Sequence, residues 1–273
     1  MARALSPHRP WPGWPLYAAL GLLGGFYVLL LVALILSLFL ADGLFSPGEA
    51  LAFLNTPPIR YALALTLGST VLTAILSVLF AVPIGYLMSR FRFPGKNFLD
   101  ALLDVPIVLP PLVVGLALLL FFMTPIGQAI ESVIPVTYAI PSVVLAQLTV
   151  AAAFAVRLMR SVFEQIDPRC EQVALTLGCS PGQAFRKVVL PQAASGIVTA
   201  WTLAWARALG EFGPVLLFAG ATRFRTEVLP TTIFLEMSVG NLEGAVAISI
   251  LMVLVAMIVL ILIRAGGGNL RGA

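Results

Sequence analysis

Apolar residues run along most of this chain in stretches long enough to cross a lipid bilayer. Six such stretches lie at roughly residues 16–41, 60–89, 98–123, 139–162, 193–220 and 242–263. A hydrocarbon core about 30 Å thick needs about 20 residues of helix, so each stretch can form one span. The pattern predicts an all-α integral membrane protein with six transmembrane helices. Residues 16–264 would form the transmembrane domain, between short tails at 1–15 and 265–273.

Composition and charge fit a protein embedded in a membrane. Of the 273 residues 60% are hydrophobic and 10% are charged, and the mean hydropathy is +1.04, whereas soluble domains carry about 25% charged residues. Twelve of the 16 Lys and Arg residues lie in the four segments that six spans place on one side, against Arg223 and Arg225 on the other. Because cytoplasmic loops are enriched in Lys and Arg, we expect both termini in the cytoplasm. The excess of basic residues indicates orientation and contact with the lipid bilayer, not nucleic-acid binding.

The one long polar interruption lies between the fourth and fifth apolar stretches, at residues 163–191. Asp167 can cap a helix that has Pro168 at its first position, where a missing N–H costs nothing. One apolar stripe at helical spacing follows, formed by Cys170, Val173, Ala174 and Leu177. Gly178 stands where a helix of this length would stop.

A second short helix is predicted directly after this glycine. Ser180 and Gln183 have the spacing of a capping box, and Leu190-Pro191 is expected to end the helix. Two short helices joined by a glycine turn would thus protrude between membrane spans. An amphipathic, basic loop of this kind could also lie on anionic headgroups. Cys170 and Cys179 both fall here, and we interpret them as reduced cytosolic residues, not as a disulfide or a metal pair.

The spacing in this loop resembles the EAA loop of permease subunits of ABC importers. That pattern is Glu-Ala-Ala, a Gly six residues after the Glu, then an aliphatic residue, one spacer and Leu-Pro. The matching positions are Ala174, Gly178, Val188, Leu190 and Pro191. The chain departs from the pattern with Gln172 in place of the Glu, Val173 in place of the first Ala, and Glu171 one position early. The resemblance implies that this loop docks into a groove of a cytoplasmic ATPase subunit, with Val173 and Leu177 available as packing contacts.

The sequence has no motif for nucleotide binding and no histidine within the apolar stretches. There is no GxxxxGK[ST] loop and no CxxC, and the single histidine is His8 in the N-terminal tail. We expect no cofactor in this chain, with ATP and Mg on the partner ATPase. An intramembrane enzyme using Asp100 and Asp104 is the remaining catalytic alternative, although a solvated or loop-contacting face explains that pair as simply. A channel or a scaffold is a third alternative.

Two charges fall near the middle of the fifth apolar stretch. Arg207 and Glu211 are four residues apart, and because a charge is costly in hydrocarbon we expect them to pair. They could belong to a hinge or line a pathway that responds to docking, or they could be a buried pair that fixes helix packing. Helix-breaking residues in the third and fifth stretches are candidate hinges: Pro110, Pro111, Gly210, Gly213 and Pro214.

Three motifs together resemble the sulfate, molybdate and tungstate branch of these permeases, over roughly residues 60–264. They are the RALGEFGP around this pair, the LPP in the third stretch and the EAA-type loop. The resemblance implies a type I ABC importer permease fold in a bacterial or archaeal plasma (inner) membrane. It also implies two ATPase subunits, an extracytoplasmic oxyanion-binding protein and a second permease copy, with a homodimer favoured over a heterodimer. Molybdate or tungstate is the expected substrate, and sulfate or thiosulfate is the alternative.

The segment Ala221–Asn241, which contains Arg223 and Arg225, is a candidate contact for the binding protein, with headgroup anchoring as the alternative. The mechanism implied by the resemblance is alternating access. ATP closes the partner ATPases, the loop helices move as rigid levers, and the path between two permease copies switches from inward- to outward-facing. Ala174, Gly178, Leu190 and Pro191 are the residues we expect to form the lever.

Overall fold

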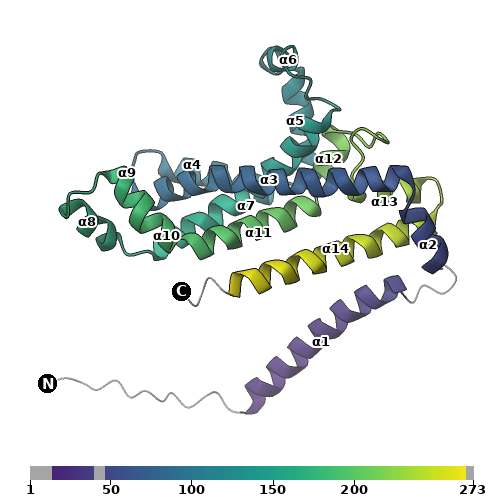
Figure 1. Cartoon of the computed structure of the whole chain (residues 1–273), viewed down its shortest axis with the longest axis horizontal. Coiled ribbons are helices and arrows are strands. Elements are labelled where there is room, and N and C mark those ends of the chain that lie inside the picture. Colours follow the sequence, from purple (N-terminus) through teal and green to yellow (C-terminus); the bar gives the residue numbers. More distant parts are fainter. Residues whose placement is uncertain (1–13, 40–46, 269–273) are drawn as a thin grey trace.

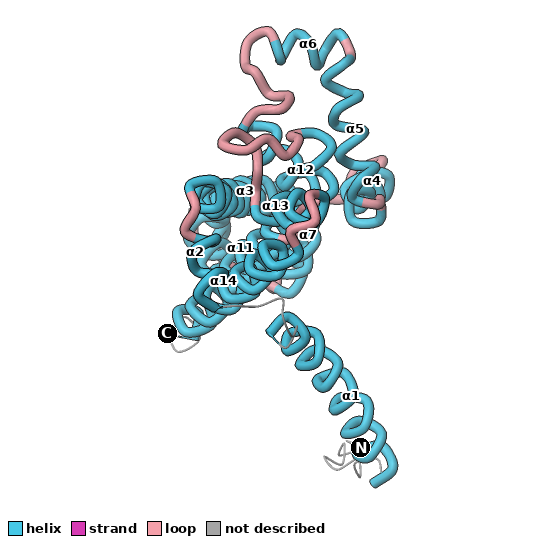
Figure 2. The backbone as a smooth tube through the Cα atoms, turned by 90° about the vertical axis from the view of Figure 1, so that its right-hand side faces the viewer, coloured by secondary structure: helices cyan, strands magenta, loops and turns pink. Residues whose placement is uncertain are grey.

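The computed structural model describes residues 14–39 and 47–268, and within them it is nearly all helical (Figure 1, Figure 2). The elements are α1 (Trp14–Phe39), α2 (Pro47–Leu54), α3 (Pro57–Arg90), α4 (Lys96–Val108), α5 (Pro111–Met123), α6 (Pro125–Glu131), α7 (Ile140–Gln165), α8 (Pro168–Thr176), α9 (Pro181–Ala184), the π-helical turn η1 (Phe185–Val189), α10 (Leu190–Gln192), α11 (Ala194–Leu209), α12 (Gly213–Phe218), α13 (Leu229–Ser238) and α14 (Leu242–Gly268). The predicted all-α class is confirmed. The predicted tails 1–15 and 265–273 lie mostly outside the described residues, and α14 continues into the second as far as Gly268.

Three helices, α3, α7 and α11, pack side by side and form the centre of the molecule, with α14 alongside α11 (Figure 1). The main apolar core lies between these three helices and includes Met159, Phe163 and Trp205. Helix α1 diverges from the others, and its described side chains are exposed over most of its length (Figure 2). The arrangement leaves α8 to α10 beyond one end of the bundle and α2 and α13 near the other.

Small side chains let α3 and α7 approach closely. The buried residues of α3 are almost all small, namely Ala62, Thr66, Ser69, Thr70, Thr73, Ala74, Ser77, Ala81 and Gly85. A β-carbon on Gly85 would lie 2.8 Å from the backbone nitrogen of Arg160 on α7. Helices in membranes associate largely through such close packing, because lipid tails are as apolar as the side chains they would replace.

Four helices, α1, α3, α7 and α14, are each long and apolar enough to cross a membrane. Two bent pairs bring the number to six if each pair counts as one span: α4 with α5, at 112°, and the helical run Pro181–Gln192 with α11, at 69°. The structure therefore has four to six candidate spans. The predicted third span, residues 98–123, is not one helix, and the predicted fifth span, 193–220, is divided into α11 and α12.

Proline explains where the third span breaks. Pro106 lies inside α4 without ending it, whereas Leu109 and Pro110 have extended backbone with ψ of 138° and 134°. A proline disfavours the helical region for the residue before it, so two prolines in a row, Pro110 and Pro111, hold both of the preceding residues extended. Helix α5 then starts at Pro111 and leaves the bundle at a steep angle (Figure 1).

Candidate functional site

The segment from α8 to α10, residues 168–192, protrudes beyond the bundle and is called the elbow here (Figure 1). Its start is capped as predicted, because Asp167 accepts a hydrogen bond of 2.9 Å from the backbone N–H of Arg169. The predicted capping box is also confirmed. Ser180 accepts from the N–H of Gln183 at 3.4 Å, and the Gln183 side chain accepts from the N–H of Ser180 at 2.9 Å.

Gly178 forms the turn of the elbow. Its φ is +88°, a left-handed conformation that glycine adopts without steric cost, and no atom outside its chain neighbours lies within 4 Å of a β-carbon built on it. The N–H of Cys179 donates to the carbonyl of Ala174 at 3.1 Å and closes the end of α8. The sharp turn therefore depends on the backbone conformation of Gly178 and not on space for its side chain.

The prediction that Leu190-Pro191 ends the second helix is wrong. The chain stays helical through η1 and α10 to Gln192. In η1 the N–H of Leu190 donates to the carbonyl of Phe185, five residues earlier. Pro191 has no N–H to donate, and we attribute its place inside a helical run to this wider turn, which relieves the clash with the carbonyl four residues back.

The predicted apolar stripe of α8 is mostly uncovered. Ala174 is buried, with 6% of its surface exposed, but Val173 is 56% exposed and Leu177 80%. Cys170 is exposed as well, and Cys179 is half-buried. The remaining predicted loop residues divide similarly: Gln172, Gly178 and Pro191 are exposed, and Glu171, Val188 and Leu190 are half-buried. Within the elbow, the apolar stripe of α8 is therefore exposed at Val173 and Leu177 and covered at Ala174.

Glu171 turns inward and fastens α8 to the end of α3. The hydroxyl of Tyr86 donates to Oε1 of Glu171, and Nε of Arg90 lies 3.5 Å from Oε2. The ring of Tyr86 packs on Phe185 of η1 and on Phe163 of α7, with centroid distances of 4.6 and 5.6 Å. Sequence patterns did not single out Tyr86 or Arg90 as partners of the loop, because both are about eighty residues away from it along the chain.

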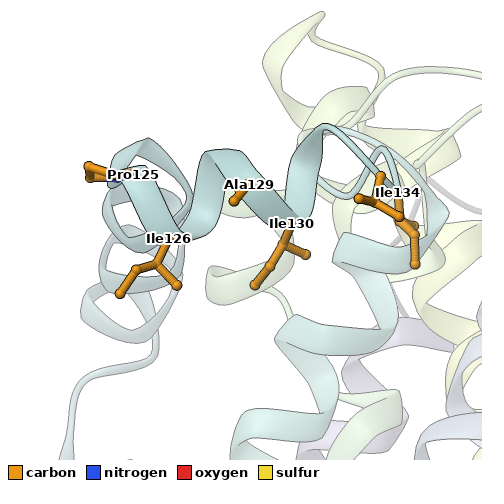
Figure 3. Close-up of a pocket in the computed structure, with 6 residues that line it drawn as sticks. Pro125, Ile126, Ala129, Ile130 and Ile134 are labelled. Carbon is orange, nitrogen blue, oxygen red and sulfur yellow. The ribbon is translucent and has the colours of Figure 1, made fainter.

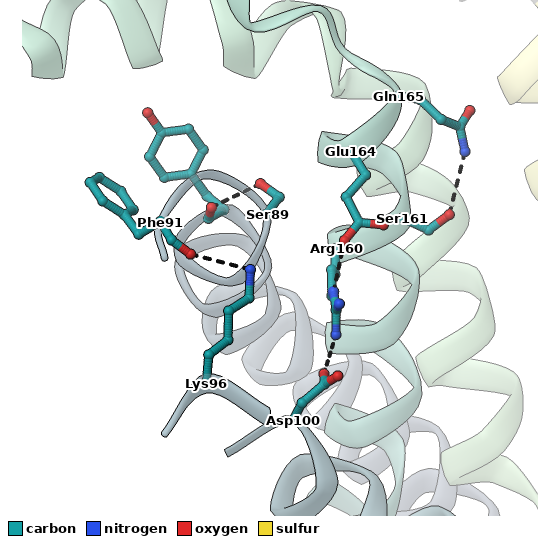
Figure 4. Close-up of polar contacts among 9 residues, drawn as sticks. Ser89, Phe91, Lys96, Asp100, Arg160, Ser161, Glu164 and Gln165 are labelled. Atoms are coloured by element: carbon teal, nitrogen blue, oxygen red, sulfur yellow. Dashed lines mark hydrogen bonds and ion pairs between the residues drawn. The ribbon is translucent and has the colours of Figure 1, made fainter. Parts of the chain in front are cut away.

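A second group of charges joins α4 to α7. Asp100 pairs with Arg160, which also binds Glu164 at 2.9 Å (Figure 4). Asp104 lies 3.6 Å from Arg157. These side chains border a cavity of about 330 Å³. Each aspartate is held by an arginine of α7, which favours a structural contact over the hypothesis of a catalytic aspartate pair.

The structure brings Arg207 and Glu211 together at 2.7 Å, although α11 ends at Leu209 and Glu211 lies in the turn that follows. The Glu211 side chain is 1% exposed and that of Arg207 is 31% exposed. The guanidinium also lies 5.6 Å from the ring centre of Phe154 on α7. The partly exposed guanidinium of Arg207 is therefore the positive charge that balances the buried carboxylate of Glu211.

The candidate hinge residues of the third and fifth stretches meet. A β-carbon on Gly213 would lie 3.1 Å from the backbone nitrogen of Leu112 and 3.2 Å from the β-carbon of Pro111. On the same interface, a β-carbon on Gly115 would lie 2.8 Å from the Cα of Pro214. The break between α4 and α5 is thus packed against the break between α11 and α12. Gly210 takes no part in this packing and has an ordinary φ of −87°.

The segment Ala221–Asn241 contains α13, which packs against α14 and α3. Arg223 binds Glu236 at 2.6 Å, and Glu236 also accepts from the Asn241 amide at 2.8 Å. Nearby, Phe224 is 55% exposed and has a φ of +58°, which is unusual for a residue with a side chain. Burial raises the pKa of Glu227, which lies between α12 and α13, outside the candidate spans.

An apolar hollow of about 640 Å³ lies under α6, away from the elbow (Figure 3). It is lined by Pro125, Ile126, Ala129, Ile130, Val133 and Ile134. No charged or hydrogen-bonding side chain lines it, so it offers nothing that would hold an anion.

Comparison with known proteins places the chain among transport proteins. Residues 81–266 match the model of the family described as binding-protein-dependent transport system inner membrane component. The chain is 32% identical over 249 residues to the sulfate transport system permease protein CysT of Salmonella typhimurium, covering 90% of this chain and 89% of that protein. It is 37% identical over 213 residues to the molybdenum transport system permease protein ModB of Mycobacterium tuberculosis, covering 77% and 80%.

The fold has solved counterparts. A bacterial ABC transporter involved in the import of the acidic polysaccharide alginate contains a chain with a TM-score of 0.76 and 17% identity, covering 94% of this chain and 96% of that one. At that identity the likeness concerns the fold alone.

Proposed function

Because the chain belongs to the family of inner membrane components of binding-protein-dependent transport systems, we propose that its elbow couples a partner ATPase to alternating access for a tetrahedral oxyanion. The chain is a permease subunit of an ABC importer. ATP hydrolysis is assigned to two partner ATPase subunits. The observation that carries the proposal is the uncovered apolar surface of α8, formed by Val173 and Leu177, on a segment that protrudes from the bundle.

The elbow is built to move as a unit and to pull on two core helices. Its two arms are capped by Asp167 and Ser180 and joined at Gly178, so each arm is a stiff short helix. One end leads directly from α7 through Ile166, and the other leads through η1 and α10 into α11. When the ATPases close on ATP, movement of the elbow would shift α7 and α11 together, and formation of ADP would reverse the shift.

The charged side chains between α4 and α7 support placing the transport path along this face of the molecule. The side chains of Arg157 and Asp104 are 67% and 40% exposed. Each lies eight residues from the elbow-side end of its helix, which is about 12 Å at 1.5 Å per residue. Because exposed charges avoid hydrocarbon, this face is assigned to the water-filled path between two permease copies. The second copy is proposed to be identical to this chain.

The elbow side is assigned to the cytoplasm of a bacterial or archaeal cell, together with both termini. The extracytoplasmic binding protein would then contact the opposite end, at Ala221–Asn241. Arg223 is occupied by Glu236, so the exposed side chains of Phe224 and Arg225 are the better candidates for that contact.

Molybdate or tungstate is the proposed substrate, supported by the 37% identity with ModB. The match with the sulfate permease CysT over 90% of the chain makes sulfate or thiosulfate the second candidate. Binding of molybdate, tungstate and sulfate to the cognate binding protein, measured by calorimetry, separates them. A protein that binds sulfate and not molybdate would overturn the first assignment.

Copurification tests the docking surface. The double variant Val173→Ser/Leu177→Ser should lose the ATPase subunit that copurifies with the tagged wild-type chain. Val133→Ser is the matched control, because Val133 is 79% exposed and lies away from the elbow. Full retention of the ATPase by the double variant would contradict the assignment.

Chemical labelling tests the orientation. Cys170 is an exposed thiol on the elbow. A membrane-impermeant maleimide should react with it in inside-out vesicles and leave it unmodified in intact cells. Reaction in intact cells would place the elbow on the outer side and exclude docking to a cytoplasmic ATPase.

A further inference from the structure

Glu171 occupies an unusual place in the elbow. Its neighbour Gln172, at the position where the EAA pattern has its glutamate, is exposed, whereas the Glu171 side chain is 16% exposed and faces α3. Both of its carboxylate oxygens lie at α3 side chains: Oε1 accepts from the Tyr86 hydroxyl, and Oε2 lies 3.5 Å from Nε of Arg90. The carboxylate of Glu171 therefore contacts side chains of this same chain.

We propose that Glu171 is a positioning residue that latches the elbow to α3, so that movement of the elbow is transmitted to α3 as well as to α7 and α11. The latch consists of Glu171, Tyr86 and Arg90. The inference rests on the proposed function, since it assumes that a partner ATPase moves the elbow.

The latch is suited to transmit movement because it contacts α8, η1 and the end of α7. Arg90 donates at 2.9 Å to the carbonyl of Ile166, where α7 turns into α8. The Tyr86 ring lies between Phe163 of α7 and Phe185 of η1. The Arg90 side chain is only 11% exposed, so water competes little for its contacts. The contact of Arg90 Nε with Glu171 is an ion pair without a hydrogen bond. The hydrogen bonds of the latch, from Tyr86 to Glu171 and from Arg90 to the Ile166 carbonyl, each have one charged partner, and such bonds are strong where water is excluded.

Helix α3 can carry the movement to the other end of the molecule. It spans 34 residues, which is about 51 Å at 1.5 Å per residue. Toward its far end the hydroxyl of Thr66 accepts a hydrogen bond of 2.9 Å from the N–H of Leu229, the first residue of α13. The segment assigned to the binding-protein side is thus joined through a single helix to the carboxylate in the elbow.

The test uses the complete transporter, reconstituted in proteoliposomes with its ATPase subunits and its binding protein. Glu171→Gln removes the charge that Arg90 binds, and Tyr86→Phe removes only the hydroxyl. For each variant the rates of ATP hydrolysis and of oxyanion uptake are measured on the same preparation. We expect the number of oxyanions taken up per ATP to fall at least threefold in either variant. Glu243→Gln is the control, because Glu243 is an exposed glutamate at the opposite end of the molecule.

The double variant Tyr86→Phe/Glu171→Gln separates a shared contact from two independent losses. If both side chains act through one latch, its uptake per ATP should resemble that of the single variants, whereas independent effects would multiply. A general loss of structure would lower the thermal unfolding temperature and both rates together, with an unchanged ratio. That outcome would overturn the latch.

Copurification distinguishes failure of the latch from failure of the proposed function. If the wild-type chain retains no ATPase, the proposed function fails and the latch fails with it. If Glu171→Gln retains the ATPase and keeps the wild-type uptake per ATP, only the latch fails. If Glu171→Gln loses the ATPase, the carboxylate serves docking, and the latch is again overturned.

Discussion

The Cα of Pro214 lies 2.8 Å from the point that a β-carbon on Gly115 would occupy. Gly115 belongs to α5 and Pro214 to α12, the helices that follow the two interruptions of the third and fifth apolar stretches. The contact places two helix breaks against each other, so neither α5 nor α12 can shift far without the other. A hinge at these proline and glycine residues stays a prediction.

Gly115→Ala should disturb this interface. A methyl group there meets backbone atoms of Pro214, which cannot rotate away, and overpacking of this kind costs about 1–3 kcal/mol. We expect a lower thermal unfolding temperature of the purified chain and slower uptake. Gly68→Ala is the matched control, because Gly68 also lies in a helix but has nothing within 4 Å of its β-position. Equal behaviour of the two variants would argue against close packing of α5 and α12.

Gly178→Val should uncouple ATP hydrolysis from uptake. A φ of +88° is unfavourable for a β-branched residue, and left-handed backbone costs about 1–2 kcal/mol for residues with a side chain, so the turn should open and change the angle between the two arms. The measurement is uptake per ATP in proteoliposomes. Gly182→Val provides the control, since Gly182 also has open space but no positive φ. Coupling that survives the change at Gly178 would show that the elbow does not act as a rigid lever.

Arg207→Leu separates the two interpretations of the buried pair. It leaves the carboxylate of Glu211 buried without its cation, which typically costs about 3–5 kcal/mol. The double variant Arg207→Leu/Glu211→Leu should recover most of the lost thermal stability, because no lone charge remains. Uptake that recovers with stability assigns the pair to packing, whereas uptake that stays low assigns it to the hinge or the path. Unchanged uptake in a stably expressed Arg207→Leu variant would exclude a functional role.

Glu227→Gln should stabilise the chain at neutral pH. Burial raises the pKa of Glu227 in the folded state above the ordinary value of a glutamate, so the folded state binds the proton more tightly than the unfolded state. Stability therefore falls as the pH rises from the unfolded pKa through the folded one. The amide cannot ionise, so the unfolding temperature should depend less on pH above the unfolded-state pKa of a glutamate and should exceed that of the wild type at pH 7.

The control for this prediction is Glu236→Gln. Glu236 is also buried, but it is bound by Arg223 and Asn241, so loss of its charge should lower the unfolding temperature. A Glu227→Gln variant with the pH dependence of the wild type would show that Glu227 is not the group responsible.

The class of protein and the shape of the elbow could be predicted from the sequence because both depend on short-range chemistry. Runs of apolar residues determine the helices in a membrane. The caps at Asp167 and Ser180 and the turn at Gly178 join atoms only a few residues apart, so residue type and spacing are sufficient to predict them. The same spacing predicted the apolar stripe of α8, although not that Ala174 would be buried while Val173 and Leu177 are exposed.

Only the tertiary structure decided which face of each helix is packed against another helix, and which distant residues come into contact. Pro110 and Pro111 indicated an interruption of the third stretch, but the angle of 112° depends on how α5 packs against α12. Pro191 does not end its helix, because the π-helical turn before it relieves the clash. In the sequence, Glu171 is a glutamate one position away from its place in the EAA pattern. The fold brings Tyr86, 85 residues earlier, within hydrogen-bonding distance of it. Such contacts are set by the packing of whole helices, and the spacing of residues along one segment carries no information about a partner on another.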